Sequence, residues 1–316
     1  MLIQLSGVIV DLVYKVEAVP RAGEEAVVHG AFVAAGGGFN AMAAARRAGM
    51  DVAYAGGLGT GPLAEVAAAA LAAEGIACLR PRSPDQDQGC CTVLVDATGE
   101  RAFIASQGAE GAAEDADFAR LRPGPGDWLL LSGYALSYPR MREAATRWLE
   151  GPAPVAPLLF DPSPMAARLE PARVAAALAR AAWVSANGAE AAALTGLGDP
   201  ASAAEALARG RGGGAVVRVG AAGCWLAEPD RRAVHLAGRP VRPLDTNGAG
   251  DAHVGAFLAA LARGEGPERA ARVANVTAAL STLREGPATA PALDAVRAAM
   301  GEAIEAAQGP PGEDEA

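Results

Sequence analysis

The stretch Asp245-Thr246-Asn247-Gly248-Ala249-Gly250-Asp251 opens directly into an apolar-periodic segment, residues 252–262. A Gly-Ala-Gly turn at a helix start leaves backbone N–H groups without partners, and the helix dipole adds positive charge there. Together they form a site for an anion. A carboxylate beside an anion site repels the anion, so its presence there indicates a function. A suitable function is to accept a proton from a hydroxyl during phosphoryl transfer. The stretch therefore predicts a kinase site that includes Asp251.

Short β-type runs alternate with helical stretches rich in alanine, leucine and arginine along the 316 residues. This alternation predicts an α/β fold, with a doubly wound, mostly parallel sheet flanked by helices, whose ligands lie at the carboxyl ends of the strands. We expect strands at 3–10, 52–55, 128–132, 158–160, 183–185 and 215–219. We expect helices at 41–48, 63–74, 139–149, 171–182, 188–194, 201–209, 252–262, 267–283 and 292–307.

Two regions, residues 13–33 and 90–105, break this alternation. They read as consecutive strands, and Asp96-Ala97-Thr98-Gly99 is typical of a hairpin turn. Strands set apart from the βα core predict a small β lid over the site, within a single domain spanning residues 1–308. An exposed edge of the lid would offer a surface for a homodimer. The acidic Pro/Gly-rich tail, 309–316, is expected to be disordered.

The composition limits the function classes. Hydrophobic residues at 51% and charged residues at 20% are globular values. A net charge of −9 and the lack of a basic patch argue against a nucleic-acid partner. The four cysteines show neither CxxC spacing nor a histidine at ligand spacing, which favours reduced thiols in the cytoplasm. The sequence shows no signal peptide and no membrane span.

A second glycine cluster, Gly36-Gly37-Gly38, precedes Asn40 and a predicted helix. Glycines let a ligand approach the backbone, and Asn40 either caps the helix or binds a polyol; a plain glycine turn explains the cluster equally well. Asp11, placed at the end of the first predicted strand, either accepts bonds from two neighbouring hydroxyls or is a solvent-exposed strand end. The absence of GxGxxG and GxxxxGK[ST] patterns excludes Rossmann and P-loop nucleotide sites.

The C-terminal stretch DTNGAGD and the segment AGGGFNAMAAARRAG at residues 35–49 resemble the two motif regions of the ribokinase-like (PfkB) carbohydrate kinases. The resemblance runs in order and spacing from residue 3 to residue 299. Weaker matches support it by their order: Asn187-Gly188-Ala189-Glu190, the turn Gly220-Ala221-Ala222-Gly223, and residues 274–279.

The resemblance implies a role for each matching residue. It makes Asp251 the general base and assigns the anion hole to the amides of Gly248, Ala249 and Gly250. The sugar hydroxyls would be held by Asp11, Gly36, Gly37 and Asn40. Mg²⁺ would be organised, through water, by Asn187 and Glu190, and the nucleotide contacted by Asn187, Gly220, Gly223 and Asn275. A monovalent cation, K⁺, would lie near Asp245 and Thr246.

The chain departs from the family pattern at three positions. Ala35 stands where a double glycine usually begins, and Gly61 stands where many members carry an aspartate. Arg218 replaces a small hydroxyl residue and touches either a phosphate or bulk solvent. These departures bear on substrate and nucleotide choice and leave the predicted base in place.

Several other polar and aromatic residues are candidates for the site. At an ordinary pKa of about 4, Asp251 would be ionised at neutral pH without tuning. His253 points to a different helix face and is expected to be structural. Tyr134 and Phe39 are expected to pack in the core rather than to line a pocket. Asp161 ends a strand, where it either faces the nucleotide cleft or forms a turn.

The leading hypothesis is an ATP-dependent kinase acting on a primary hydroxyl of a sugar or sugar derivative. A nucleoside kinase of the same fold is an alternative, although aromatic residues at only 4% offer few candidates for stacking on a base. A non-catalytic sugar-binding regulator is a further alternative, against which the intact Asp251 argues. The identity of the acceptor does not follow from the sequence.

Overall fold

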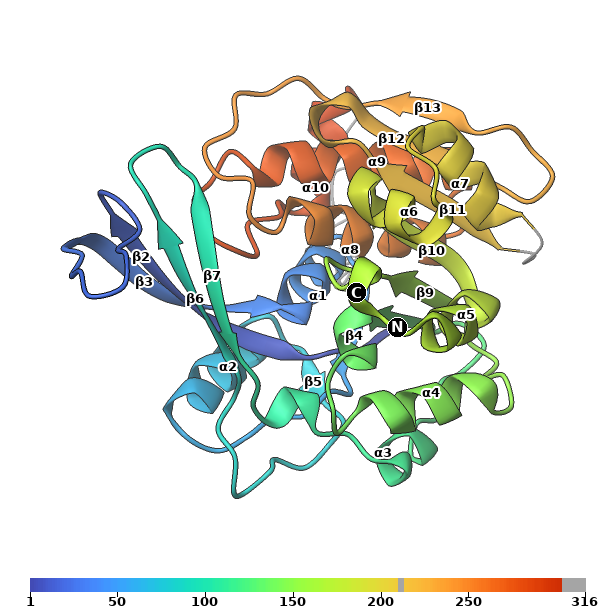
Figure 1. The fold of residues 1–316 in the computed structure, drawn as a ribbon. Coiled ribbons are helices and arrows are strands. Elements are labelled where there is room, and N and C mark those ends of the chain that lie inside the picture. Colours follow the sequence, from blue (N-terminus) through green and yellow to red (C-terminus); the bar gives the residue numbers. More distant parts are fainter. Residues whose placement is uncertain (210–212, 303–316) are drawn as a thin grey trace, which may run out of the picture.

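The computed structural model describes residues 1–209 and 213–302. A nine-stranded sheet forms its centre, in the order β13-β12-β11-β10-β9-β8-β1-β4-β5 (Figure 1). The seven strands from β11 to β5 run parallel, whereas β12 and β13 are antiparallel additions at one edge. The strands are β1 Leu2–Gln4, β4 Val52–Tyr54, β5 Ala77–Cys78, β8 Trp128–Ser132, β9 Leu158–Asp161, β10 Ala181–Asn187, β11 Gly214–Arg218, β12 Gly223–Ala227 and β13 Val234–Ala237.

Helices cover both faces of this sheet, each over its own hydrophobic core. Successive strand residues point to opposite faces, so Leu130 lies in one core and Leu129 and Leu131 lie in the other. The first core includes α1 Gly38–Arg47, α2 Pro62–Ala73, α8 Ala249–Ala262, α9 Pro267–Ser281 and α10 Leu293–Ala299. The second includes α3 Asp115–Ala119, α4 Arg142–Glu150, α5 Pro171–Arg180, α6 Gly188–Thr195 and α7 Pro200–Ala208. The doubly wound α/β fold is thereby confirmed.

Small residues bring α1 and α8 close together. A Cβ atom at Gly255 of α8 would lie only 2.2 Å from the carbonyl oxygen of Ala41 and 2.8 Å from the Cβ atom of Ala44, both in α1. Only glycine permits this approach of the two backbones. The close packing matters for the site, because Asn40 stands near the start of α1 and Asp251 near the start of α8.

A four-stranded lid sheet projects from one side of the molecule, in the order β3-β2-β6-β7 (Figure 1). Its strands are β2 Val8–Val16, β3 Val28–Gly37, β6 Cys90–Val95 and β7 Arg101–Ser106. The pair β2–β6 is parallel, and the pairs β2–β3 and β6–β7 are antiparallel. The lid sheet therefore extends beyond the predicted bounds, 13–33 and 90–105, at both ends of the first segment.

The expected single strand over residues 3–10 is wrong. The chain leaves the central sheet after Gln4 and enters the lid sheet at Val8, so Asp11 lies inside β2 and not at the end of a central strand. The break falls at Gly7, where a Cβ atom would lie 2.5 Å from Cγ of Glu110 and where the carbonyl accepts from Gly38 N at 2.9 Å. Glu110 comes from a distant part of the chain.

The last predicted helix, 292–307, ends earlier, at Ala299. Residues 303–307 and the predicted disordered tail, 309–316, lie outside the described residues. Over the ranges 1–209 and 213–302, no helix combines the length and apolar character needed to span a bilayer.

Candidate functional site

Three neighbouring strands deliver polar side chains to the carboxyl edge of the central sheet. Asp161 ends β9, Asn187 ends β10 and Arg218 ends β11. Asn187 and Arg218 are direct partners in the parallel register. In doubly wound sheets this edge is where ligands bind.

Asp251 lies in the first turn of α8, and its Oδ2 accepts a hydrogen bond from Nδ2 of Asn40 at 3.0 Å. Asn40 is 5% exposed, and its Oδ1 is buried without a partner among the described residues. A buried acceptor without a donor is costly, so it marks a place where a ligand hydroxyl can bind. The structure thus joins the two motif regions, 211 positions apart, in one hydrogen bond.

Burial raises the pKa of Asp251 to about 7. The Asn40 bond and the positive charge of Arg218 act in the opposite direction, while the charges of Asp161 and Asp11 add to the increase. The expectation that Asp251 keeps an ordinary pKa is therefore wrong. The reason is that its surroundings are provided by four residues scattered over the chain, so the stretch around it does not reveal them.

The turn that begins α8 is the place where the sequence predicts an anion hole. Gly248 is the N-cap residue with φ 73°, a left-handed conformation that favours glycine. Within the described part of the chain, no backbone hydrogen bond engages the N–H groups of Gly248 or Gly250, and that of Ala249 reaches the carbonyl of Thr246 only at 3.3 Å. These donors are available for an anion.

Arg218 lies beside this turn: a Cβ atom at Gly250 would be 3.7 Å from Nε of Arg218. Its guanidinium donates to Asp161 at 3.2 Å, to Glu190 at 3.4 Å and to the Ser185 hydroxyl. The side chain is only 13% exposed, which excludes the alternative that it points into bulk solvent. Asp161 has the predicted turn role, since its other oxygen accepts the turn N–H of Ser163 at 2.8 Å.

Asn187 and Glu190 form a capping box at the start of α6. Asn187 Oδ1 accepts from Glu190 N at 2.9 Å, and Glu190 Oε2 accepts from Asn187 N at 2.7 Å. Burial and the nearby charge of Asp161 raise the pKa of Glu190, against the effect of Arg218.

The described residues contain no group of three His, Cys, Asp or Glu side chains able to hold a metal by itself. Mg²⁺ in phosphoryl-transfer sites keeps several waters and binds one or two carboxylates together with substrate phosphates. Glu190 and Asp161 supply hard oxygens of this kind beside the anion hole. They fit an ion that arrives with the nucleotide and is held through water.

Asp11 faces the same region from the lid sheet. It is 7% exposed, burial raises its pKa to about 6, and no hydrogen bond or ion pair joins its carboxylate to another described residue. A Cβ atom at Gly36 would lie 2.3 Å from Asp11 Oδ2, so Gly36 keeps the carboxylate free. Gly37, with φ 60°, is the N-cap residue of α1 and turns the chain toward Asn40.

The predicted nucleotide residues are divided between an open turn and the interior. Gly220 has φ 62°, and a Cβ atom added there would have nothing within 4 Å. Gly223 is enclosed, because a Cβ atom added there would lie 2.1 Å from the carbonyl oxygen of Leu236. Asn275 is buried in α9, where its Nδ2 donates to Leu236 O at 2.9 Å and its Oδ1 lies 3.2 Å from Nε2 of His253. Burial lowers the pKa of His253 to about 3, in keeping with a structural role.

Asp245 meets a residue that the sequence did not single out. Its Oδ1 accepts from Asn247 N at 2.8 Å and its Oδ2 from Gly286 N at 3.0 Å, and Arg101 of β7 forms an ion pair with it at 2.5 Å. Thr246 follows, with its carbonyl facing the N–H of Ala249. The only signal for Arg101 in the sequence is its place just after the predicted hairpin turn at 96–99.

Two aromatic predictions have different outcomes. Phe39 is 6% exposed and belongs to the core, as expected. Tyr134 is 40% exposed, so its expected core packing is wrong. Burial raises the pKa of the Tyr134 phenol, and the charges of Cys91, Asp251, Glu190 and Asp161 add to this increase.

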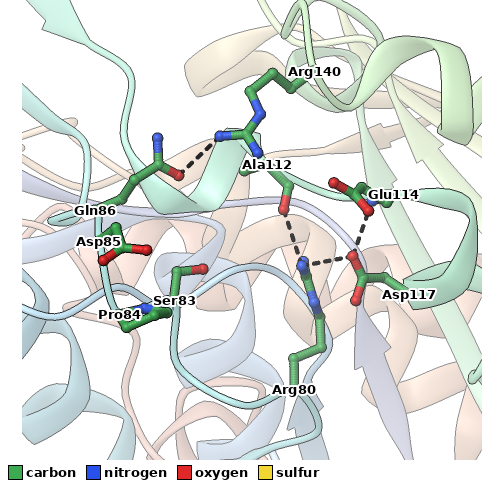
Figure 2. A pocket seen from close by; sticks show the side chains of 9 residues that line it. All are labelled: Arg80, Ser83, Pro84, Asp85, Gln86, Ala112, Glu114, Asp117 and Arg140. Carbon is green, nitrogen blue, oxygen red and sulfur yellow. Dashed lines mark hydrogen bonds and ion pairs between the residues drawn. The ribbon is translucent and has the colours of Figure 1, made fainter.

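A separate surface pocket lies between the loop that follows β5 and the segment around α3 (Figure 2). Its two arginines are engaged by neighbouring lining residues: Arg80 donates to Asp117 at 2.7 Å, and Arg140 donates to Gln86 at 3.2 Å. None of the predicted site residues lines it. The chemistry therefore gathers at the strand ends and not in this pocket.

Comparison with known proteins agrees with this geometry. A model described as the pfkB family carbohydrate kinase matches residues 4–294. The chain is 30% identical to an uncharacterised sugar kinase of Escherichia coli K12, YegV, over 270 residues, 82% of this chain and 81% of that protein. A ribokinase structure from Thermotoga maritima superposes with a TM-score of 0.80 at 24% identity, covering 95% of this chain and 99% of that one. A nucleoside kinase of Burkholderia thailandensis in complex with inosine gives 0.75 at 19% identity, covering 95% and 97%.

Proposed function

The chain belongs to the PfkB family of carbohydrate kinases, and on that premise we propose that it transfers the γ-phosphoryl group of ATP to a primary hydroxyl of a sugar or sugar derivative. One observation carries the proposal. The Asp251 carboxylate accepts a hydrogen bond from Asn40 at 3.0 Å and stands at the turn where, among the described residues, the Gly248 and Gly250 N–H groups have no backbone partner. A proton acceptor and an anion hole at one point are what phosphoryl transfer to an alcohol requires.

The acceptor lies between the lid sheet and α1. Asp11 and the unpaired Oδ1 of Asn40 accept hydrogen bonds from sugar hydroxyls, and Gly36 and Gly37 let the sugar approach the backbone. Asp251 takes the proton of the primary hydroxyl as its oxygen attacks the phosphorus atom. The bond from Asn40 keeps the Asp251 carboxylate oriented toward that hydroxyl.

The phosphoryl group lies against the turn that starts α8. The N–H groups of Gly248, Ala249 and Gly250 stabilise its developing charge, each by about 3 kcal/mol. Arg218, held by Asp161 and Glu190, faces the same oxygens. Asn187 and Glu190 would hold Mg²⁺ through water, and the ion would supply positive charge to the phosphates. The nucleotide extends past Gly220 and Gly223 toward the helix that carries Asn275.

A nucleoside acceptor is the second candidate, and the exposed ring of Tyr134 near Asp251 favours it. A nucleoside presents the same primary hydroxyl, and its base would stack on an aromatic ring. A non-catalytic sugar-binding regulator remains the third candidate. The pKa of Asp251, raised to about 7, argues against the regulator, because sugar binding alone does not require a proton acceptor.

An ADP-release assay across pentoses, ketohexoses, sugar acids and nucleosides tests these candidates. We expect turnover with at least one sugar that carries a primary hydroxyl, and none with the same sugar lacking that hydroxyl. Turnover with nucleosides alone would select the second candidate. Tight sugar binding without ADP release would overturn the kinase assignment in favour of the regulator.

The protein acts in the cytoplasm as a homodimer joined through the lid sheet. Its edge strands β3 and β7 carry exposed apolar side chains, with Val33 54%, Phe103 63% and Ile104 64% exposed. Val33 and Ile104 belong to one cross-strand row of the sheet, through Leu12 and Thr92. A row of this kind on a sheet with two open edges supports pairing with a second copy.

A further inference from the structure

Both carboxylate oxygens of Asp245 accept hydrogen bonds from other parts of the protein. Oδ1 accepts from the N–H of Asn247 in the same loop, and Oδ2 accepts from the N–H of Gly286. The Arg101 guanidinium, which comes from the lid sheet, also donates to Oδ1. The Asp245 side chain is 12% exposed and that of Arg101 is 26% exposed. This ion pair is sheltered, unlike most surface pairs.

The pair connects the lid sheet to the loop that forms the anion hole. Arg101 begins β7, and Asp245 lies three residues before Gly248. The N–H groups of Leu244 and Asp245 both donate to the carbonyl of Thr282, at 2.7 and 3.1 Å, which anchors the loop to the end of α9. The position of Asp245 therefore depends on α9 from one side and on the lid from the other.

A monovalent cation at this carboxylate does not fit the residues present. It would have to displace Arg101 from Oδ1, and the guanidinium already supplies a unit positive charge with directed hydrogen bonds. Burial raises the pKa of Asp245, but the N–H groups of Asn247 and Gly286 and then Arg101 outweigh burial, so the net pKa is lowered. The carboxylate is thus ionised and neutralised without a metal.

We propose that Arg101 takes the place of a monovalent cation, neutralising Asp245 and ordering the anion-hole loop only when the lid sheet is docked. Arg101 is a positioning residue, because it acts through Asp245 and does not touch the phosphoryl group. The inference rests on the proposed kinase function. It implies that catalysis needs no K⁺ and that closure of the lid completes the anion hole.

A second contact between the lid and the same loop region provides a matched control. Lys15 of β2 forms an ion pair with Glu285, but both side chains are about half exposed, at 49% and 46%. Among the described residues, no hydrogen bond or ion pair joins the side chain of Lys15 or Glu285 to Asp245. Lys15→Met therefore removes one lid cation without touching the anion-hole loop, whereas Arg101→Met removes the cation that holds it.

The experiment measures ADP release in K⁺, Na⁺ and tetramethylammonium chloride at equal ionic strength. We expect the wild-type enzyme and Lys15→Met to differ by less than about twofold among the three salts. Arg101→Met should lose about tenfold or more of kcat in tetramethylammonium, the usual size of a coupling between sites, and recover part of it in K⁺. Arg101→Lys, which keeps the charge, should show no K⁺ activation.

A thermal-unfolding arm needs no acceptor and keeps the inference separate from the kinase assignment. Arg101→Met should gain stability on exchange of tetramethylammonium for K⁺, and the wild-type protein should not. Activation or stabilisation of the wild-type protein by K⁺ would overturn the proposal, as would equal behaviour of Arg101→Met and Lys15→Met. The wild-type comparison requires no variant to fold.

Discussion

Asp251 experiences opposing influences on its charge. Burial and two neighbouring carboxylates, Asp161 and Asp11, favour the protonated form, and Asn40 and Arg218 favour the ionised form. The balance places the pKa at about 7. A general base works best when its pKa lies near the operating pH, so this environment suits proton transfer from a sugar hydroxyl at neutral pH.

The pH dependence of kcat/KM for the acceptor follows from that pKa. Because only ionised Asp251 accepts a proton, activity should fall on acidification with an apparent pKa of about 7, above the usual range of an aspartate. Asn40→Ala removes a bond that lowers the pKa and should move this limb to higher pH. The pH dependence of kcat/KM at saturating ATP, recorded for the wild-type protein and for Asn40→Ala, measures the apparent pKa of each. An acidic limb confined to below about pH 5 would contradict the assignment.

At the residue scale, the sequence predicted what depends on local turn chemistry. Gly248, Gly250 and Asp251 could be interpreted together because the first N–H groups of any helix lack partners within the helix. A glycine turn at that point leaves them accessible. Arg101 and Arg218 could not be assigned in this way. Their partners, Asp245 and Asp161, are 144 and 57 positions away, and only the fold brings them together.

Among the elements, the strand that carries Asp11 shows a limit of the hydrophobic pattern. Residues 2–16 are mostly apolar, and the pair Ser6-Gly7 is the weak turn signal that the prediction of one strand over 3–10 passed over. The break at Gly7 arises from close contact with Glu110, a buried carboxylate that accepts from Gly89 N at 2.7 Å and Gly108 N at 3.0 Å. As a result, Asp11 belongs to the lid sheet, so its proposed role in acceptor binding would depend on the position of the lid.

A glycine exchange within β3 tests the acceptor site. Gly36→Ala places a Cβ atom 2.3 Å from Asp11 Oδ2, so the carboxylate must leave its position and the acceptor KM should rise by about tenfold or more. Gly30→Ala in the same strand is the control, because its Cβ atom would be 3.5 Å from Cδ of the flexible Lys15 side chain. The measurement is the acceptor KM of both variants by steady-state kinetics. Equal acceptor KM values would count against Asp11 as a sugar ligand.

Over the whole molecule, the order of strands and helices was predictable because each parallel strand and its helix bury a recognisable apolar pattern. The hydrophobic pattern did not predict the antiparallel strands β12 and β13 or the short helix α3. The docking of the lid on the C-terminal half also depends on single pairs, Arg101 with Asp245 and Lys15 with Glu285. Such pairs leave no periodic trace in a sequence.

The homodimer makes a prediction at this scale. Val33 and Ile104, replaced together with aspartate, should shift the protein from dimer to monomer in sedimentation velocity, because two charges would be buried at the interface. Val155→Asp is the control, since Val155 is 72% exposed and lies outside the lid sheet. A wild-type protein that sediments as a monomer at every concentration would contradict pairing through the lid.

The central claim is that Asp251 is the base of a phosphoryl transfer to a sugar hydroxyl. The most direct measurement compares kcat and the acceptor dissociation constant of the wild-type protein with those of Asp251→Asn, which keeps the shape and the contact with Asn40. We predict a fall in kcat of about two to four orders of magnitude, with acceptor binding changed by less than about threefold. Turnover near the wild-type rate in Asp251→Asn would contradict the account.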